Sequence, residues 1–133
     1  MQGTGSAFMG GPNARVGLFA AYYALQTEEA AIKEMEYTYS IRTSIRDIRT
    51  HFVNMQAAVR AFALRGYLDS LPPYDEGKKQ IAAILADLRS NTAQDPDQQQ
   101  KWDEIEKNIH SWDNDIAVKV IDVRQKINIG KAT

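Results

Sequence analysis

Apolar residues recur at alternating intervals of four and three along the first half of the chain. They are Ile41, Ile45, Ile48, Phe52, Met55, Val59 and Phe62. Polar residues, among them four arginines, fill the positions between them. This spacing keeps one apolar stripe facing a partner and is typical of helices packed at a shallow angle. Because helix-forming residues dominate from Ala20 onward, the pattern predicts one long helix from about Ala20 to Leu68.

The apolar spacing changes phase near the middle of this predicted helix. Ile32, Met35 and Tyr39 keep the same rhythm but are one residue out of phase with the stripe that begins at Ile41. The seam is therefore expected to shift between Thr38 and Ile41. We expect the part of the helix before the shift to be less tightly specified, and hence able to move.

Two further helices are predicted after breaks in the pattern. Paired prolines in the segment 69–73 remove two backbone donors and interrupt the first helix. A second helix is predicted from about Tyr74 to Ser90. Its apolar face is expected to contain Ile81, Ile84, Leu85 and Leu88. Later, Asp95 stands at an N-cap position, Pro96 at the first helical position and Gln98 at the third, which is close to a capping box.

The third helix is expected to run from this cap to about Ile127. One stripe of it carries Trp102, Ile105, Ile109, Trp112, Ile116, Val120, Val123 and Ile127. No segment alternates convincingly as a strand. The predicted fold class is therefore all-α: an elongated bundle of three helices (long, short, long), interpreted as half of a dimeric or truncated four-helix up-and-down bundle.

The first 19 residues differ in character from the rest. Residues 1–13 contain four of the eight glycines and lack the basic start and apolar middle of a secretory signal. The apolar run Val16–Leu25 is about half of the roughly 20 residues that span a membrane. We interpret residues 1–19 as a flexible lead or cloning remnant with a membrane-proximal stub, and 20–133 as the helical, sensor-like domain.

Composition removes several classes of function. Lys and Arg total 16 against 17 Asp and Glu, and this balance disfavours generic nucleic-acid binding. The absence of cysteine excludes disulfides, thiolate zinc sites and cysteine nucleophiles. With only His51 and His110, a metal site would need carboxylates, and no phosphate-binding glycine loop is present. We therefore expect no catalytic residue, cofactor or metal.

Three sets of residues leave alternatives open. The ladder Arg42, Arg46, Arg49, Arg60 and Arg65 is a solvated face or, across a dimer, a site for a carboxylate or phosphate. Trp102 and Trp112 form core packing or an aromatic ligand cage. His110 is a surface histidine or a pH sensor.

A glycine late in the first predicted helix is a further exception. Gly66 occupies a position where glycine is about 1 kcal/mol less favourable than alanine, so we expect another backbone to approach closely there. Tyr67 is expected to place its ring in the core and its hydroxyl at the edge.

At these residues the chain resembles the third class of CHASE domains, which are extracytoplasmic sensor modules of bacterial receptors. An Arg-Gly-Tyr-Leu run, a Leu-x-Pro-Tyr pattern and an Asp-Pro-x-Gln helix start carry the resemblance in order. The residues concerned are Arg65, Gly66, Tyr67, Leu68, Pro72, Tyr74, Asp95, Pro96, Gln98 and Trp112. The chain departs from the family at Ala61, where an acidic residue is usual, and at Phe62 and Ala63, which replace Thr-Gly.

The resemblance implies signal input rather than catalysis. Such domains form four-helix bundles that dimerise through their long helices and sit between two membrane-spanning helices of histidine kinases, cyclases or chemoreceptors. It implies a homodimer on the periplasmic or extracytoplasmic face of a membrane, with an unidentified small-molecule ligand as a further option and no nucleic acid as a partner. The alternatives are a non-sensory helical oligomerisation or assembly protein, or a small helical enzyme that holds an anion with arginines.

Overall fold

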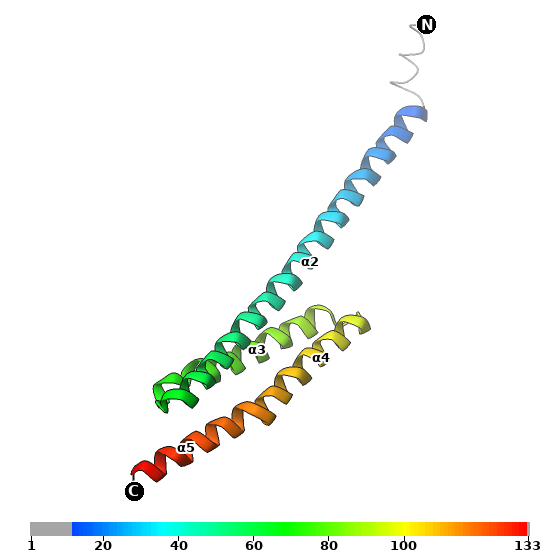
Figure 1. Ribbon diagram of the computed structural model, residues 1–133. Coiled ribbons are helices and arrows are strands. Elements are labelled where there is room, and N and C mark those ends of the chain that lie inside the picture. The colour runs from blue at the N-terminus through cyan, green and yellow to red at the C-terminus, as the bar shows by residue number, and fades with distance from the viewer. Residues whose placement is uncertain (1–11, 133) are drawn as a thin grey trace. The chain divides into compact units, whose positions relative to one another are not determined.

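The computed structural model of the chain describes residues 12–132 (Figure 1). The elements are α2 (Pro12–Arg65), a 3-10 turn η1 (Leu68–Ser70), α3 (Pro72–Asn91), α4 (Pro96–Trp112), a π-helical segment η2 (Asp113–Ala117) and α5 (Val118–Ala132). The described residues contain no strand, and α4, η2 and α5 follow one another without a break. The prediction of an all-α fold with a long, a shorter and a long helix is confirmed.

The chain divides into two units between Ser40 and Ile41. In the first unit the described residues form a single helix, in which every side chain from Gly17 to Ser40 is exposed. The predicted helix start at Ala20 was eight residues too late, because α2 begins at Pro12. Proline suits the first helical position, where its missing N–H is not needed. Of the predicted lead and stub at residues 1–19, residues 1–11 lie outside the described residues, and residues 12–19 are helical.

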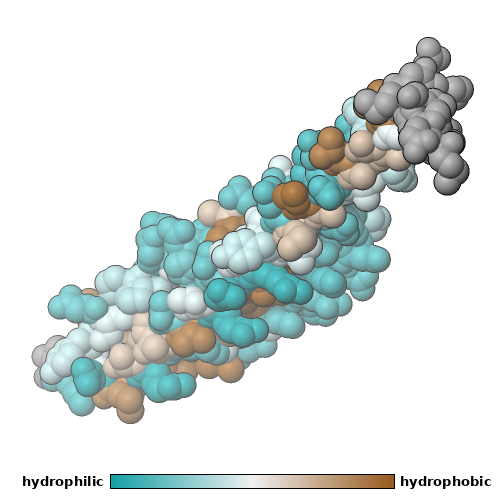
Figure 2. Space-filling model, turned by 90° about the horizontal axis from the view of Figure 1, so that it is seen from above, coloured by the Kyte–Doolittle hydropathy of each residue, from teal (hydrophilic) through white to brown (hydrophobic). Residues whose placement is uncertain are grey.

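The second unit contains the core and places α3 antiparallel to its two neighbours (Figure 1). The predicted inward stripe from Ile41 to Phe62 is confirmed, since all seven members are buried or half-buried and the arginine ladder is exposed. The buried apolar residues are Ile48, Met55, Ala58, Val59, Phe62, Tyr74, Ile81, Leu85, Leu88, Trp102 and Ala117. One face of the surface is hydrophilic with separate apolar patches (Figure 2).

A glycine brings α3 close to α2 in this core. Gly77 is buried, and a Cβ atom there would overlap Cγ of Met55 and lie 3.1 Å from the carbonyl oxygen of His51. The lack of a side chain at Gly77 therefore sets the distance between the two helices. The sequence contained no clear signal of this contact, because a lone glycine inside a helix also occurs without a packing role.

Helix α2 ends three residues earlier than predicted. Gly66 has a φ of +74°, the left-handed conformation that glycine adopts without steric strain, and its N–H donates to the carbonyl of Phe62 at 2.7 Å. The chain then turns away from the helix axis. The expectation that Tyr67 packs in the core was wrong, since 67% of its surface is exposed.

The connection between α3 and α4 is organised by Thr92. Its buried hydroxyl donates to the carbonyl of Leu88 at 2.6 Å and accepts the indole N–H of Trp102 at 2.9 Å. Asp95 caps α4 as predicted, with its carboxylate accepting from the backbone N–H of Asp97 and Gln98 at 3.1 and 3.3 Å. The N–H of Asp95 donates instead to the Thr92 carbonyl, so the reciprocal bond of a capping box is not formed.

The predicted stripe of the third helix is correct as far as Trp112 and again at Val120, which is half-buried against the core. Beyond Trp112, Ile116, Val123 and Ile127 are exposed, whereas Asp113 and Ala117 are buried. A π-helical turn contains one more residue than an α-helical turn. After η2, each residue that faces the core is therefore one position later than a continuous α-helix would place it. The inward positions of α5 then include Ile121, Arg124 and Asn128, all of which are partly buried.

Candidate functional site

A buried tyrosine and aspartate join α3 to the π-helical segment. The hydroxyl of Tyr74 donates to Oδ1 of Asp113, and both residues are less than 8% exposed. Lys78 lies one helical turn after Tyr74, and its Nζ is 3.1 Å from Oδ2 of Asp113 and 5.0 Å from the centre of the Tyr74 ring. Both carboxylate oxygens are therefore held by one face of α3.

The environment keeps Tyr74 protonated. Burial raises the pKa of its phenol well above the ordinary value, and the hydrogen bond to Asp113 and the negative charge of that carboxylate raise it further. Tyr74 is consequently a permanent hydrogen-bond donor at physiological pH. In this cluster Tyr74 therefore positions the Asp113 carboxylate as a fixed donor.

The ring of Trp112 packs against Tyr74 at the edge of this cluster. Its ring meets Phe52 edge to face, with the ring centres 5.2 Å apart, and meets Tyr74 at 6.5 Å. Such edge-to-face pairs stabilise packing beyond the area that they bury. Trp102 bonds to Thr92 in the α3–α4 connection and forms no ring pair with Trp112 among the described contacts. This arrangement favours the core-packing interpretation of the two tryptophans over a shared ligand cage.

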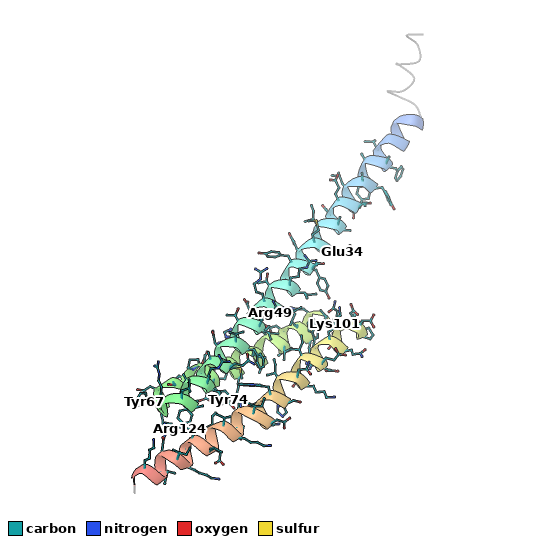
Figure 3. The ribbon with its side chains drawn as sticks, viewed as in Figure 1. Glu34, Arg49, Tyr67, Tyr74, Lys101 and Arg124 are labelled. Carbon is teal, nitrogen blue, oxygen red and sulfur yellow. The ribbon has the colours of Figure 1, made fainter. Side chains whose placement is uncertain are left out.

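A second polar contact lies where α2 ends. Asn128 on α5 donates from Nδ2 to the carbonyl of Gly66 at 2.9 Å, and a Cβ atom on Gly66 would lie 2.6 Å from Nε of Arg124. Figure 3 labels Arg124 close to Tyr67 at this end of the unit. The expectation that another backbone approaches Gly66 was wrong, because two side chains of α5 do so. Neither Arg124 nor Asn128 was singled out from the sequence, because both lie off the apolar stripe predicted for the third helix.

The sequence-predicted motif residues occupy the ends of helices. Arg65, Gly66, Tyr67 and Leu68 lie where α2 ends, Pro72 and Tyr74 lie where α3 begins, and Asp95, Pro96 and Gln98 lie where α4 begins. Of this set, the structure brings Tyr74 together with Trp112. Two members of the Tyr74 cluster, Lys78 and Asp113, were not singled out from the sequence, and the predicted α-helical register placed Asp113 off the inward stripe.

The arginine that joins two helices is outside the predicted ladder. Arg89 on α3 binds Asp103 at 2.6 Å and also Glu106, both on α4. The hydrogen bond to Asp103, reinforced by the one to Glu106, raises the pKa of the guanidinium group.

Among residues 12–132, no group of three histidine or acidic side chains is arranged to hold a metal ion. No helix in the same range is long and apolar enough to cross a bilayer.

The comparisons with known proteins decide the family. A family model described as the CHASE3 domain matches residues 31–133. The chain belongs to the CHASE3 domain family. The searches of curated proteins and of solved structures gave no significant match.

CHASE3 domains are extracellular sensory domains of bacterial signalling receptors. The resemblance seen in the sequence is thereby confirmed, together with a sensory rather than catalytic domain type and an extracytoplasmic location. The CHASE3 match begins within α2 and includes all of the second unit, so Tyr74, Lys78 and Asp113 lie inside the sensory domain.

Proposed function

We propose that this CHASE3 domain is the periplasmic input of a membrane-anchored histidine kinase, cyclase or chemoreceptor, and that a cue acts on it by changing the helical register of α5 at η2. The observation that carries this proposal is the burial of Asp113 at the start of η2. There, Tyr74 and Lys78 hold the first residue of the π-helical segment against α3. Such segments inside α-helices are frequently found at functional sites.

The sequence contains an apolar stripe for a second register. In the observed register Ala117, Ile121, Arg124 and Asn128 face inward. A continuous α-helix through 113–117 would instead turn Ile116, Val123 and Ile127 inward, which corresponds to a rotation of α5 by about 100°. Two packings of one helix are the kind of discrete alternative that a sensor requires.

Two of the contributions that separate the registers oppose each other and are of similar size. Burying the exposed parts of Ile116, Val123 and Ile127, which are 51%, 56% and 43% exposed, contributes about 3 kcal/mol in total. The hydrogen bond of Tyr74 to the charged Asp113 opposes this with about 1.5–3 kcal/mol. The half-exposed Lys78 contributes less, because solvent screens its pair with Asp113. A ligand that binds one register more tightly than the other, by a free energy of this size, is sufficient to shift such a balance.

The function is tested in a membrane-anchored receptor that carries this chain as its sensory domain. Deleting Asn114 removes the extra residue of η2 and keeps the observed register in a continuous α-helix. Tyr74→Phe removes the bond that holds Asp113 and favours the second register. We expect the two variants to move basal receptor output in opposite directions. Output that is unchanged in both, or shifted in the same direction, would contradict the proposal.

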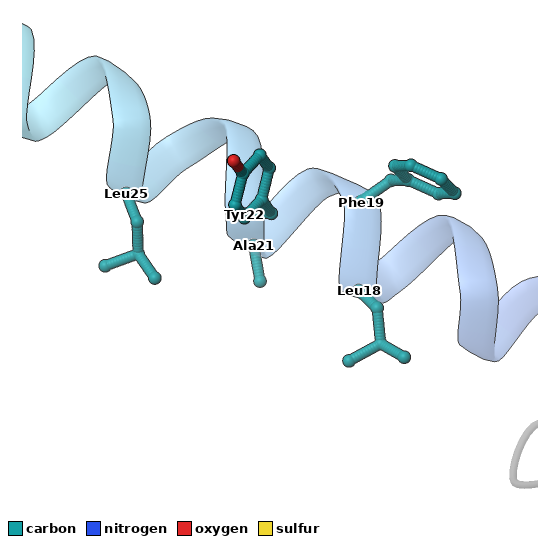
Figure 4. Close-up of a pocket in the computed structure, with 5 residues that line it drawn as sticks. All are labelled: Leu18, Phe19, Ala21, Tyr22 and Leu25. Carbon is teal, nitrogen blue, oxygen red and sulfur yellow. The ribbon is translucent and has the colours of Figure 1, made fainter.

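We also propose that a second copy of the chain covers residues 17–40. Leu18, Ala21 and Leu25 point to one side of α2 (Figure 4), and Ile32 and Tyr39 continue the heptad spacing of Leu18 and Leu25. All of these side chains are exposed. Receptors anchored in one membrane share an orientation, so a parallel pair places each stripe against its own copy.

The dimer is tested by light scattering after size exclusion. We expect the wild-type chain to show twice the monomer mass and the double variant Leu25→Glu, Ile32→Glu to show the monomer mass. Ala24→Glu with Ala31→Glu places the same charges farther from the centre of the stripe, and we expect it to weaken the dimer less. A monomeric wild-type chain at high concentration would contradict the proposal.

A further inference from the structure

A cavity of about 150 Å³ opens between α2, α3 and α4 in the second unit. Its inner wall is apolar, with Met55, Ile81 and Leu85 each no more than 5% exposed. Its charged lining residues are the exposed Lys78 and Glu106 and the buried Asp113. The cavity therefore combines a buried apolar wall with a few charged groups, as small-molecule sites commonly do.

The charges around this cavity favour a cation. Within its lining, Lys78 supplies one positive charge, whereas Glu106 and Asp113 supply two negative charges. Arg89, which binds Glu106, is also paired with Asp103, and neither Arg89 nor Asp103 lines the cavity. A carboxylate has about four acceptor positions, so Glu106 and Asp113 retain acceptor capacity beyond their present partners.

We propose that this cavity binds a small primary amine. The ammonium group donates hydrogen bonds to Glu106 and Asp113, and the alkyl part contacts Met55, Ile81 and Leu85. A cavity of about 150 Å³ accommodates a molecule the size of benzene, so the alkyl part contains about four to six carbon atoms. The ammonium competes with Lys78 for Asp113, which couples occupancy of the cavity to the first residue of η2.

An effect of the amine on signalling depends on the register change proposed above. Binding of the amine to the cavity does not depend on it. Binding is tested by titration calorimetry of the chain with 3-methylbutylamine. The controls are 3-methylbutanol and 3-methylbutanoate, which keep the carbon skeleton and remove or reverse the charge. We expect the amine to bind with a stoichiometry of one per chain and the two controls to bind at least about tenfold more weakly. Equal binding of all three, or no binding of the amine, would overturn the proposal.

Two carboxylates offer a matched pair of variants. Glu106 and Asp103 both bind Arg89, but of the two only Glu106 lines the cavity. We expect Glu106→Gln to weaken amine binding about tenfold and Asp103→Asn to leave it within about twofold. Equal losses in the two variants would show that the effect arises from Arg89, and would overturn the assignment of Glu106 as a ligand.

Two neighbouring alanines test the cavity itself. Ala82 lines it, whereas the adjacent Ala83 is exposed outside it. We expect Ala82→Leu to abolish amine binding and Ala83→Leu to retain it, with unchanged helical circular dichroism in both.

The binding site and the register change can fail separately. Amine binding without any change in receptor output would contradict the register proposal and leave the proposed amine site intact. If the amine does not bind, the proposal of an amine site is wrong, regardless of the effect of the register variants on receptor output.

Discussion

The phenol of Tyr74, in the first turn of α3, donates a hydrogen bond to the carboxylate of Asp113, 39 residues later at the start of η2. This bond crosses between two helical segments and is buried. It joins the residue that begins a π-helical segment to the helix that lies beside it. Its removal should therefore affect both the stability of the domain and the register of α5.

Tyr74→Phe is expected to destabilise the domain by about 1–3 kcal/mol, because it leaves one buried oxygen of Asp113 without its donor. The measurement is the free energy of unfolding from urea titration. Tyr67→Phe is the matched control, since Tyr67 is exposed, and it should change the same free energy by less than about 0.5 kcal/mol. Similar values for the two variants would show that the Tyr74 hydroxyl contributes nothing specific.

Alkaline pH should weaken the domain through the same tyrosine. The folded-state pKa of Tyr74 is raised above the ordinary value of 10.0, so its contribution to stability is complete below pH 10. That contribution is lost as the pH rises through the folded-state value. Between pH 9 and pH 11, about one unit on either side of the ordinary pKa, the wild-type chain should lose more unfolding free energy than Tyr74→Phe. Parallel loss in the two proteins would argue against a perturbed Tyr74.

Deletion of one residue distinguishes η2 from the rest of the third helix. Removing Asn114 converts the π-helical segment to α-helix with the same inward residues, and should change stability by less than about 1 kcal/mol. Removing Lys107 from α4 forces a rotation of about 100° between the parts on either side. That deletion should destabilise the domain by about 3 kcal/mol or more, because Trp102 leaves the core.

Engineered cysteines report the register directly, since the chain has no cysteine of its own. In the wild-type background Ile116→Cys should react rapidly with a thiol reagent and Ala117→Cys slowly. The same order should hold after deletion of Asn114. Equal reactivity at the two positions would contradict the burial of Ala117.

Gly77→Ala should destabilise the domain although alanine is the better helix former. The added methyl group meets Met55 and the backbone of His51, so about 1–3 kcal/mol of overpacking outweighs a gain of about 1 kcal/mol in helix propensity. Gly17→Ala is the control, because a Cβ atom there has open space around it. Thermal unfolding followed by circular dichroism should give a lower midpoint for the first variant and an unchanged or higher one for the second.

The helices, their breaks and the cap at Asp95 were predictable because they depend on local chemistry. The spacing of apolar residues, the paired prolines and the N-cap carboxylate act within a few residues of where they stand. The same local information identified Tyr74 and Trp112 as motif residues of the CHASE3 resemblance. It also predicted the inward stripes correctly as far as Trp112.

The register of α5 was not predictable in this way, because the pattern after Trp112 favours Ile116, Val123 and Ile127 as inward residues. The tertiary structure places Asp113 and Ala117 inward instead, because Tyr74 and Lys78 of α3 hold the Asp113 carboxylate. By itself, the sequence determined the helices and the family. The bonds between helices decided which residues of the last helix face the core, since a π-helical turn of this kind depends on partners 35 and 39 residues away.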